Sequence, residues 1–306
     1  METFKILIAG GNGFLGSNLV KKLSKYHEIT VVDVVERYSV LKESYENVNF
    51  IKIDISNYNQ LGKLPKVDVI YNFASPASVL AFGKDNFVSL SNSAFSSFIS
   101  LLNWSKNNSV IKYIFPSSGT VYGSTASNLN RTLSPITIYG VLKLAHESLA
   151  YLYRENFDVT GLRIFMGYGP GEEIKGDFAS PVYQFLSDTI ARRVPTIWGD
   201  GKQSRDLIYI ADIVDVMATA LDLSGINYFD VGTGVNTDFN SIIRIISSIV
   251  GRDVKVKYIP KPRTYVNHTS ADPKFVKNLL KRDLIGSEEG IKRFYDYLIS
   301  KKMKRK

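Results

Sequence analysis

The chain has 306 residues, 44% of them hydrophobic, and is therefore long enough to bury a large core in one domain or in two joined lobes. It contains no cysteine, which excludes disulfides, thiolate chemistry and cysteine-ligated zinc, and its three histidines are too scattered to predict a metal site. The formal net charge of +9 suits anionic partners. Because the sequence shows neither an apolar run of about eighteen residues nor a secretion signal, we predict a cytoplasmic protein without a membrane partner.

The first half of the chain alternates apolar, strand-like runs with helix-length segments. The predicted strands are Lys5–Ala9, Glu28–Val32, Val48–Lys52, Val67–Asn72, Lys112–Pro116 and Val159–Ile164. Two long helices are predicted at Val88–Lys106 and Tyr139–Arg154. Continuous apolar strands separated by helices indicate a parallel sheet that is covered on both faces. The predicted fold class is therefore α/β, a Rossmann-like doubly wound parallel sheet, with ligands at the carboxyl ends of its strands.

The second half is less regular and predicts a smaller α/β lobe. Its expected elements are a loop at Gly167–Gly176, helices at Pro181–Arg192, Ile210–Leu221, Ser241–Val250 and Ser287–Ile299, and strands at Tyr228–Val231 and Lys255–Ile259. We find no internal repeat and no low-complexity linker. The two halves are therefore expected to share one interface with the ligand between them.

A glycine-rich turn, Gly10–Gly16, connects the first predicted strand to a helix. Glycines let the backbone approach a pyrophosphate, and a helix N-terminus offers unpaired N–H groups and a partial positive charge. Asp33 ends the next apolar run, close to the spacing expected for a carboxylate that binds the adenosine ribose hydroxyls. The pattern predicts dinucleotide binding. It favours NAD over NADP, because a carboxylate would repel a 2′-phosphate.

Three polar residues form the candidate catalytic group. Tyr139 and Lys143 have the i, i+4 spacing that puts both on one helix face. Tyrosine has a pKa of about 10 and is a poor base near neutrality, but a lysine ammonium one turn away and a positive nicotinamide would favour its phenolate. That phenolate could take a proton from a sugar or alcohol hydroxyl while hydride leaves the same carbon. Ser118, just beyond the strand Lys112–Pro116, could bond the substrate oxygen and help carry its proton.

Together these segments resemble the extended short-chain dehydrogenase/reductase family, and within it the nucleotide-sugar epimerases of the UDP-glucose 4-epimerase type. Gly10–Gly16 has the GxxGxxG spacing of that family, and Tyr139–Lys143 matches its YxxxK motif. The segment Ser117–Gly123 resembles the serine loop, in which Ser118 takes the position of the catalytic Ser/Thr. The resemblance extends over nearly the whole chain.

The resemblance implies NAD as the cofactor and no metal. In this family Lys143 would hold the nicotinamide ribose, Asp54 would lie at the adenine amine, and the backbone at Phe73 and Ala74 would run under the cofactor. The implied cofactor-binding residues are Gly10, Gly13, Phe14, Leu15, Gly16, Asp33, Asp54, Ile55, Phe73, Ala74, Tyr139, Lys143 and Phe165.

The resemblance also implies a nucleotide-diphosphate sugar as substrate, with Ser118, Tyr139 and Lys143 as catalytic residues. The implied substrate-binding residues are Ser118, Thr120, Met166, Arg205 and Arg263. The two arginines match a pair that binds a diphosphate, which planar guanidinium groups suit well. Met166 stands where the family usually has an asparagine that contacts the diphosphate. Leu207 and Val266 are further departures, and all three concern the nucleotide and sugar rather than the redox chemistry.

The leading hypothesis is epimerisation of a UDP-glucose/UDP-galactose type sugar at C4 through a transient 4-keto intermediate. The 4,6-dehydratases of the family carry an Asp-Glu pair where this chain has Gly119 and Thr120, so their chemistry is not expected. A 4-ketosugar-nucleotide reductase is the alternative, because it needs the same Ser, Tyr and Lys. A distant alternative is a non-catalytic dinucleotide- or RNA-binding protein, but the intact catalytic group argues against a nucleic-acid partner.

We predict the NAD-binding domain over residues 1–165, with 205–232 returning to it. The substrate-binding lobe is then formed by 166–204 and 233–306. Members of the family usually pair two subunits through the helices that correspond to Val88–Lys106 and Tyr139–Arg154. The resemblance therefore implies a homodimer.

Overall fold

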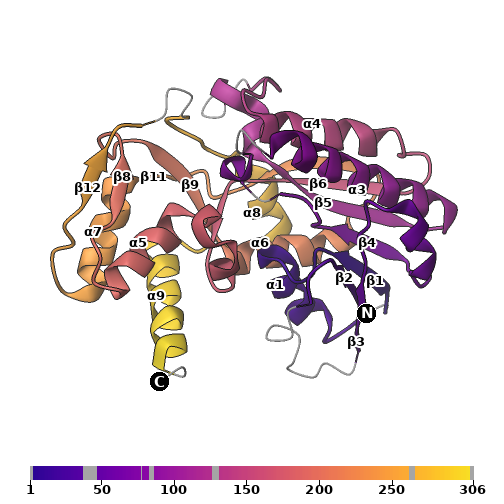
Figure 1. The fold of residues 1–306 in the computed structure, drawn as a ribbon, viewed down its shortest axis with the longest axis horizontal. Helices are drawn as coiled ribbons and strands as arrows, with labels where there is room; N and C mark the ends of the chain where they lie inside the picture. The colour runs from indigo at the N-terminus through magenta and orange to yellow at the C-terminus, as the bar shows by residue number, and fades with distance from the viewer. Residues whose placement is uncertain are drawn as a thin grey trace.

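The computed structural model describes residues 3–36, 47–76, 78–82, 86–125, 131–261 and 266–303, with only the backbone described at 124 and 125. Two lobes lie side by side along the long axis of the molecule (Figure 1). The larger lobe contains the N-terminal strand and the main sheet, and the smaller lobe carries two short sheets and the C-terminal helix. None of the helices in these residues combines the length and apolar character of a membrane span.

The described residues of the larger lobe form a seven-stranded parallel sheet with the order β10-β6-β5-β4-β1-β2-β3. The strands are β1 (Lys5–Ala9), β2 (Glu28–Asp33), β3 (Val48–Lys52), β4 (Val69–Asn72), β5 (Lys112–Ser118), β6 (Asp158–Ile164) and β10 (Ile226–Val231). The chain moves outward from β1 to β3 and then crosses back to β4 on the other side of β1. The sheet therefore has its topological switch point between β1 and β4, which is where such folds bind their ligands. This confirms the predicted fold class.

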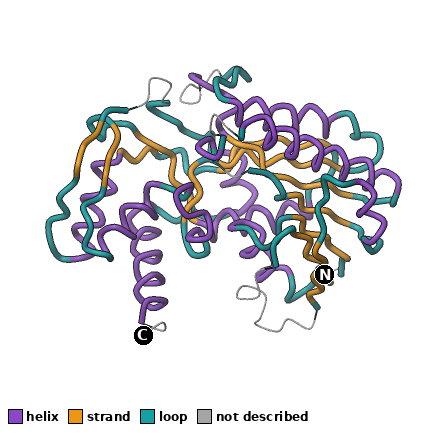
Figure 2. The backbone as a smooth tube through the Cα atoms, in the orientation of Figure 1, coloured by secondary structure: helices purple, strands orange, loops and turns teal. Residues whose placement is uncertain are grey.

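Helices cover both faces of the sheet (Figures 1 and 2). One pair is α1 (Phe14–Leu23) and α6 (Ile210–Thr219), and the other is α3 (Phe87–Asn107) and α4 (Ile138–Tyr151). The buried side chains of β1 alternate between the two layers. Ile6 and Ile8 belong to the core that contains residues of α1 and α6, whereas Leu7 and Ala9 belong to the core that contains residues of α3. A strand that is buried on both faces reads as a continuous apolar run.

The smaller lobe is built from short elements. Its sheets have the orders β11-β9-β7 and β12-β8. The strands are β7 (Met166–Tyr168), β8 (Thr196–Trp198), β9 (Ser204–Tyr209), β11 (Asn236–Asp238) and β12 (Lys257–Ile259). The helices are α5 (Pro181–Ile190), α7 (Phe239–Val250) and α9 (Ser287–Met303), whereas α8 (Lys274–Leu280) packs against α6 and β10 of the larger lobe. Short 3-10 helices complete the described part of the chain: η1 (Tyr58–Lys63), η2 (Val79–Ala81), η3 (Gly119–Thr125), η4 (Glu172–Phe178) and η5 (Ala220–Asp222).

Two differences from the sequence-based prediction concern the cleft. The segment Gly167–Gly176 was predicted as a loop, but it contains most of β7 and the beginning of η4. Within 205–232, β10 lies in the main sheet while β9 lies in a small one. The proposed domain boundaries themselves stay a prediction.

Candidate active site

The turn after β1 is packed so closely that Gly10 and Gly16 have no space for a side chain. Gly10 has a φ of +73°, and a Cβ there would lie 2.8 Å from the Ala74 nitrogen, across the switch point. A Cβ on Gly16 would lie 2.5 Å from the Gly10 oxygen. Helix α1 then begins after Gly13 without a side-chain cap. Backbone N–H groups that no side chain covers or caps, at the N-terminus of a helix, fit the pyrophosphate of a dinucleotide.

Asp33 is held at the end of β2 by backbone groups. Its Oδ2 accepts a hydrogen bond of 3.1 Å from the Asn12 N–H, and its Oδ1 accepts one of 3.1 Å from the Val35 N–H. The carboxylate lines the same cavity as the glycine turn. Its position therefore fits the predicted contact with the adenosine ribose.

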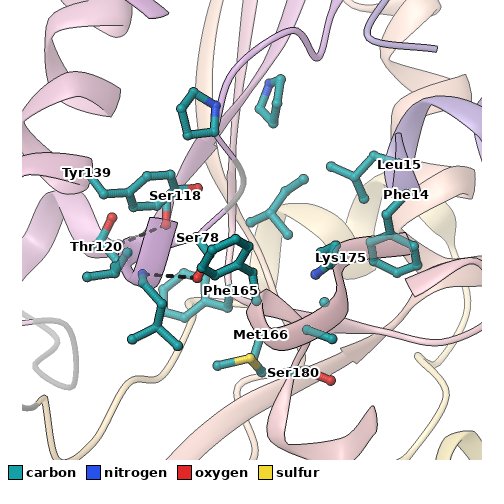
Figure 3. A pocket seen from close by; sticks show the side chains of 18 of the residues that line it. Phe14, Leu15, Ser78, Ser118, Thr120, Tyr139, Phe165, Met166, Lys175 and Ser180 are labelled. Carbon is teal, nitrogen blue, oxygen red and sulfur yellow. Dashed lines mark hydrogen bonds between the residues drawn. The ribbon is translucent and has the colours of Figure 1, made fainter. Parts of the chain in front are cut away.

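Ser118, Tyr139 and Lys143 line one cavity of about 900 Å³, which also contains the glycine turn. Figure 3 shows the Tyr139 ring beside Ser118. The Lys143 ammonium donates a hydrogen bond of 3.0 Å to the Pro116 oxygen and lies 5.5 Å from the centre of the Tyr139 ring. The Thr137 hydroxyl caps α4 by accepting from the Gly140 N–H, which fixes the turn that carries Tyr139. The three predicted catalytic residues are thus brought together.

Burial is the main cause of the pKa shifts of Tyr139 and Lys143. It raises the pKa of Tyr139 to about 12, although a side-chain hydrogen bond with Ser118 acts in the opposite direction. It also lowers the pKa of Lys143 to about 8. The sequence-based expectation was that Lys143 and a positive nicotinamide together favour the phenolate. In the protein by itself the phenol remains protonated at neutral pH, because desolvation outweighs the effect of nearby groups.

A buried ion pair lies behind the catalytic group. Glu147 follows Lys143 by one further turn of α4, and its carboxylate accepts hydrogen bonds of 2.9 Å and 2.7 Å from Nε and Nη2 of Arg163 on β6. The hydroxyl of Ser117, the neighbour of Ser118, donates to the same carboxylate. The sequence analysis did not identify Glu147. Its signal was present, because 139, 143 and 147 continue the i, i+4 pattern on one helix face.

The other side of the cavity belongs to the smaller lobe. Met166 and Arg205, two of the predicted substrate contacts, line it, as does Trp198 of β8, whereas Thr120 lines the cavity from η3 of the larger lobe. The Arg205 guanidinium donates to the backbone oxygens of Ser204 (2.8 Å) and Asn267 (3.2 Å), so its position is fixed by the chain. Arg263 lies outside the described residues.

Most of the predicted cofactor-binding residues line the cavity, and three do not. Those that line it are Gly10, Gly13, Phe14, Leu15, Gly16, Asp33, Phe73, Tyr139, Lys143 and Phe165. Asp54, Ile55 and Ala74 are not among the lining residues, and their roles stay predictions. Two lining residues were missed by the sequence analysis: Ser75, which accepts a hydrogen bond of 3.4 Å from Lys143, and Lys175. Ser75 belongs to the segment after the fourth strand that the resemblance placed under the cofactor, whereas nothing in the local sequence marked Lys175.

A doubly wound sheet, a bare glycine turn at its switch point and a Ser–Tyr–Lys group in the same cavity define a dinucleotide-dependent enzyme of the short-chain dehydrogenase/reductase class. The chain belongs to the NAD dependent epimerase/dehydratase family, whose model matches residues 6–232. The predicted family and its cofactor, NAD, are thereby confirmed.

Comparisons with individual proteins agree with this assignment. An uncharacterized UDP-glucose epimerase of Bacillus subtilis (strain 168) is 27% identical over 97% of this chain and 98% of its own. The structure of a UDP-N-acetylglucosamine 4-epimerase from Methanobrevibacter ruminantium M1, in complex with UDP-N-acetylmuramic acid, matches with a TM-score of 0.90 and 25% identity over 98% of this chain and 100% of that one. A UDP-glucuronic acid 4-epimerase from Bacillus cereus, in complex with UDP-glucuronic acid and NAD, matches with a TM-score of 0.84 and 26% identity over 97% and 99%. The chain is thus an enzyme of the NAD-dependent nucleotide-sugar epimerase family.

Proposed function

We propose that the protein epimerises a nucleotide-diphosphate sugar at C4 through a transient 4-keto sugar, with a UDP-glucose/UDP-galactose type substrate. The observation that carries the proposal is the position of Ser118 and Tyr139. They line a single cavity together with the glycine turn after β1 and with Arg205 of β9. A sugar that reaches this point can have a dinucleotide beside it and its own nucleotide in the smaller lobe.

The mechanism follows from the groups that surround the sugar. Tyr139 takes the proton of the 4-hydroxyl, and Ser118 hydrogen-bonds the same oxygen and holds it in line with the phenol. NAD⁺, when bound, would accept the hydride that leaves C4 and later return it, and its positive ring would favour the phenolate. Lys143 stays anchored to the Pro116 oxygen while it adds positive charge beside Tyr139. The 4-keto sugar then rotates, takes the hydride on its other face, and recovers its proton from Tyr139. The residues act mainly by positioning and by excluding water.

The test is Tyr139→Phe, assayed with UDP-glucose, UDP-galactose, their N-acetyl forms and UDP-glucuronate. Loss of the general base should lower kcat by roughly a factor of 10² to 10⁴ with whichever sugar the wild type epimerises. Tyr151→Phe is the matched control, because Tyr151 is an exposed tyrosine on the same helix. Unchanged epimerisation by Tyr139→Phe would refute the mechanism. Net oxidation of NADH with a 4-keto sugar would favour the reductase alternative.

We also propose that two subunits pair through α3 and α4. Both helices expose apolar side chains, including Val88 and Phe95 on α3 and Val141 on α4. On α3, Phe98 and Leu102 are buried in the core, whereas Phe95 is exposed. The substitution Val141→Asp should shift the molecular mass measured by light scattering from dimer to monomer. A wild-type monomer would contradict the proposal.

A further inference from the structure

A lysine that no motif marked bridges the two lobes across the cavity. Lys175 belongs to η4 in the smaller lobe, yet its ammonium lies 4.7 Å from the centre of the Phe14 ring. Phe14 is the first residue of α1, directly after the glycine turn. Figure 3 shows both side chains among those that line the pocket. Lys175 thus brings a positive charge to the helix end where a pyrophosphate is expected.

A buried carboxylate holds this lysine in place. Glu172, fully buried, accepts a 2.9 Å ion pair from Lys175. It also accepts hydrogen bonds from the N–H (2.6 Å) and the hydroxyl (2.8 Å) of Ser180, at the start of α5. The negative charge of Glu172 is therefore shared among three donors. The bond to Glu172 uses one of the three N–H donors of the Lys175 ammonium, so two donors remain for other partners. The Lys175 side chain is 16% exposed.

Two positive charges meet at this end of the cavity, and that of Lys175 is partly offset by Glu172. The N-terminus of α1 carries the positive end of the helix dipole, and its first turn contains no acidic residue. Placing the Lys175 ammonium beside it adds positive charge that favours an anionic ligand at this end of the cavity, although Glu172 already offsets part of that charge. Three of the described residues that line the cavity are cations, namely Lys143, Lys175 and Arg205. Lys143 is bound to the Pro116 oxygen and Arg205 to backbone oxygens of the smaller lobe, so Lys175 is the cation placed at the α1 end.

We propose that Lys175 is a diphosphate contact, whose ammonium binds a phosphate of a nucleotide seated in the cleft against the N-terminus of α1. The inference rests on the proposed function, since it takes the ligands to be NAD and a nucleotide-diphosphate sugar. It also gives the smaller lobe a phosphate contact on the wall where Met166 presents a thioether, which offers no donor. Charge-assisted hydrogen bonds to phosphate are stronger than neutral ones, so the loss of one such bond should lower the affinity for the whole nucleotide measurably.

The experiment is calorimetric titration of the wild type, Lys175→Met and Lys175→Arg with four probes: NAD⁺, UDP, adenosine and uridine. Lys175→Met should weaken at least one of the diphosphate ligands by roughly ten- to a hundredfold. The two nucleosides, which lack phosphates, should bind all three proteins equally. Lys175→Arg should restore most of the lost affinity. A loss confined to NAD⁺ assigns the contact to the cofactor diphosphate, and a loss confined to UDP assigns it to the substrate diphosphate.

Lys292→Met is the charge-matched control. Lys292 is exposed on α9 and pairs with Asp296, so the variant loses the same charge away from the cavity and should bind all four probes as the wild type does. The inference is overturned if Lys175→Met changes neither diphosphate ligand by more than twofold. It is also overturned if the nucleosides weaken equally, or if the wild type binds neither NAD⁺ nor UDP. Because binding is measured without turnover, a Lys175 effect in a protein that epimerises no sugar would sink the proposed function and leave this contact standing.

Discussion

The two walls of the cleft are built from different parts of the polypeptide. The cofactor wall, formed by Gly10–Gly16 with Asp33 and Phe73, is made largely of backbone, and its glycines leave no space for a Cβ. The substrate wall, formed by β7, η4, β8 and β9, is made of side chains such as Met166 and Arg205. A site made of backbone N–H groups can keep binding a phosphate when the side chains around it change. A site made of side chains can change its ligand when a single residue is substituted.

This contrast explains what the relatives share. Proteins described as epimerases of UDP-glucose, UDP-N-acetylglucosamine and UDP-glucuronic acid all match nearly the full length of this chain. The main sheet and the glycine turn can stay constant while the second wall is exchanged. We therefore expect changes in the cofactor wall to abolish function, and changes in the substrate wall to alter affinity by smaller factors.

The largest effect is expected for Gly16→Val. A Cβ at Gly16 would meet the Gly10 oxygen at 2.5 Å and the Gly11 Cα at 2.7 Å, so the turn must open. We expect NAD⁺ affinity to fall by roughly a thousandfold, with a loss of stability of about 1–3 kcal/mol from overpacking. UDP binding should persist, because it depends on the other wall. Calorimetry with both ligands checks this.

Gly62→Ala is the matched control for the glycine turn, because a Cβ at Gly62 meets nothing within 4 Å. It should leave the NAD⁺ affinity unchanged. If Gly16→Val bound NAD⁺ normally, or lost NAD⁺ and UDP together, the two walls could not be treated as separate sites.

The two walls also differ in how far the sequence predicts them. Gly10–Gly16 and the pair Tyr139 and Lys143 are recognisable because each requirement is local: a turn must lead into a helix, or two residues must share one helix face. The role of Lys175 depends on η4 packing against α1, where Asn18 donates to the Pro170 oxygen 152 residues away. No local pattern encodes that contact.

The sequence analysis did not predict the short strands β8 and β11, because these also depend on contacts between distant parts of the chain. β8 and β11 have three residues each, too few to show a period of two, and they exist because a distant strand pairs with them. The strands of the main sheet are longer and, apart from the edge strands β3 and β10, largely buried on both faces, so their apolar runs predicted them well. Most of the cofactor wall could therefore be predicted from the sequence, whereas the arrangement of the substrate wall became visible only in the structure.

The next effect in size concerns the buried ion pair behind the catalytic group. Glu147→Gln removes the charge that Arg163 pairs with, and both side chains are largely buried. An uncompensated buried charge typically costs about 3–5 kcal/mol. We expect a loss of that order in the free energy of unfolding, measured with urea. The control is Glu155→Gln, whose partner Arg154 forms an exposed pair worth about 0–1 kcal/mol. Equal losses in both variants would show that the buried pair has no special role.

Lys143→Met tests whether function and stability conflict at the catalytic group. Burial lowers the pKa of Lys143 to about 8 in the folded state, so below that pH the fold carries the full cost of a buried ammonium. As pH rises from about 8 toward the unfolded value, the folded state releases its proton first and wild-type stability increases, by about 3 kcal/mol in total. The Met variant lacks this gain. We expect it to lose activity but to be more stable than the wild type at pH 7.

The stability advantage of Lys143→Met should shrink as the pH approaches 10. Paired urea titrations of the two proteins at pH 7, 8.5 and 10 isolate Lys143, because the other titrating groups are common to both. A pH-independent difference would mean that the ammonium is not desolvated in the folded protein. A variant that is less stable at pH 7 would mean that its bond to the Pro116 oxygen outweighs its burial.

The smallest effect is expected on the substrate wall, with Arg205→Lys. The guanidinium of Arg205 already donates to the Ser204 and Asn267 oxygens, and a lysine cannot keep those bonds and also bind a phosphate in a planar, forked manner. We expect KM for the nucleotide sugar to rise by about tenfold, or about 1.4 kcal/mol, with NAD⁺ affinity unchanged. Arg244→Lys is the control, because Arg244 is exposed on α7. If Arg205→Lys instead weakened NAD⁺ and left KM unchanged, Arg205 would belong functionally to the cofactor wall, and the division between backbone and side-chain walls would fail at the residue chosen to define it.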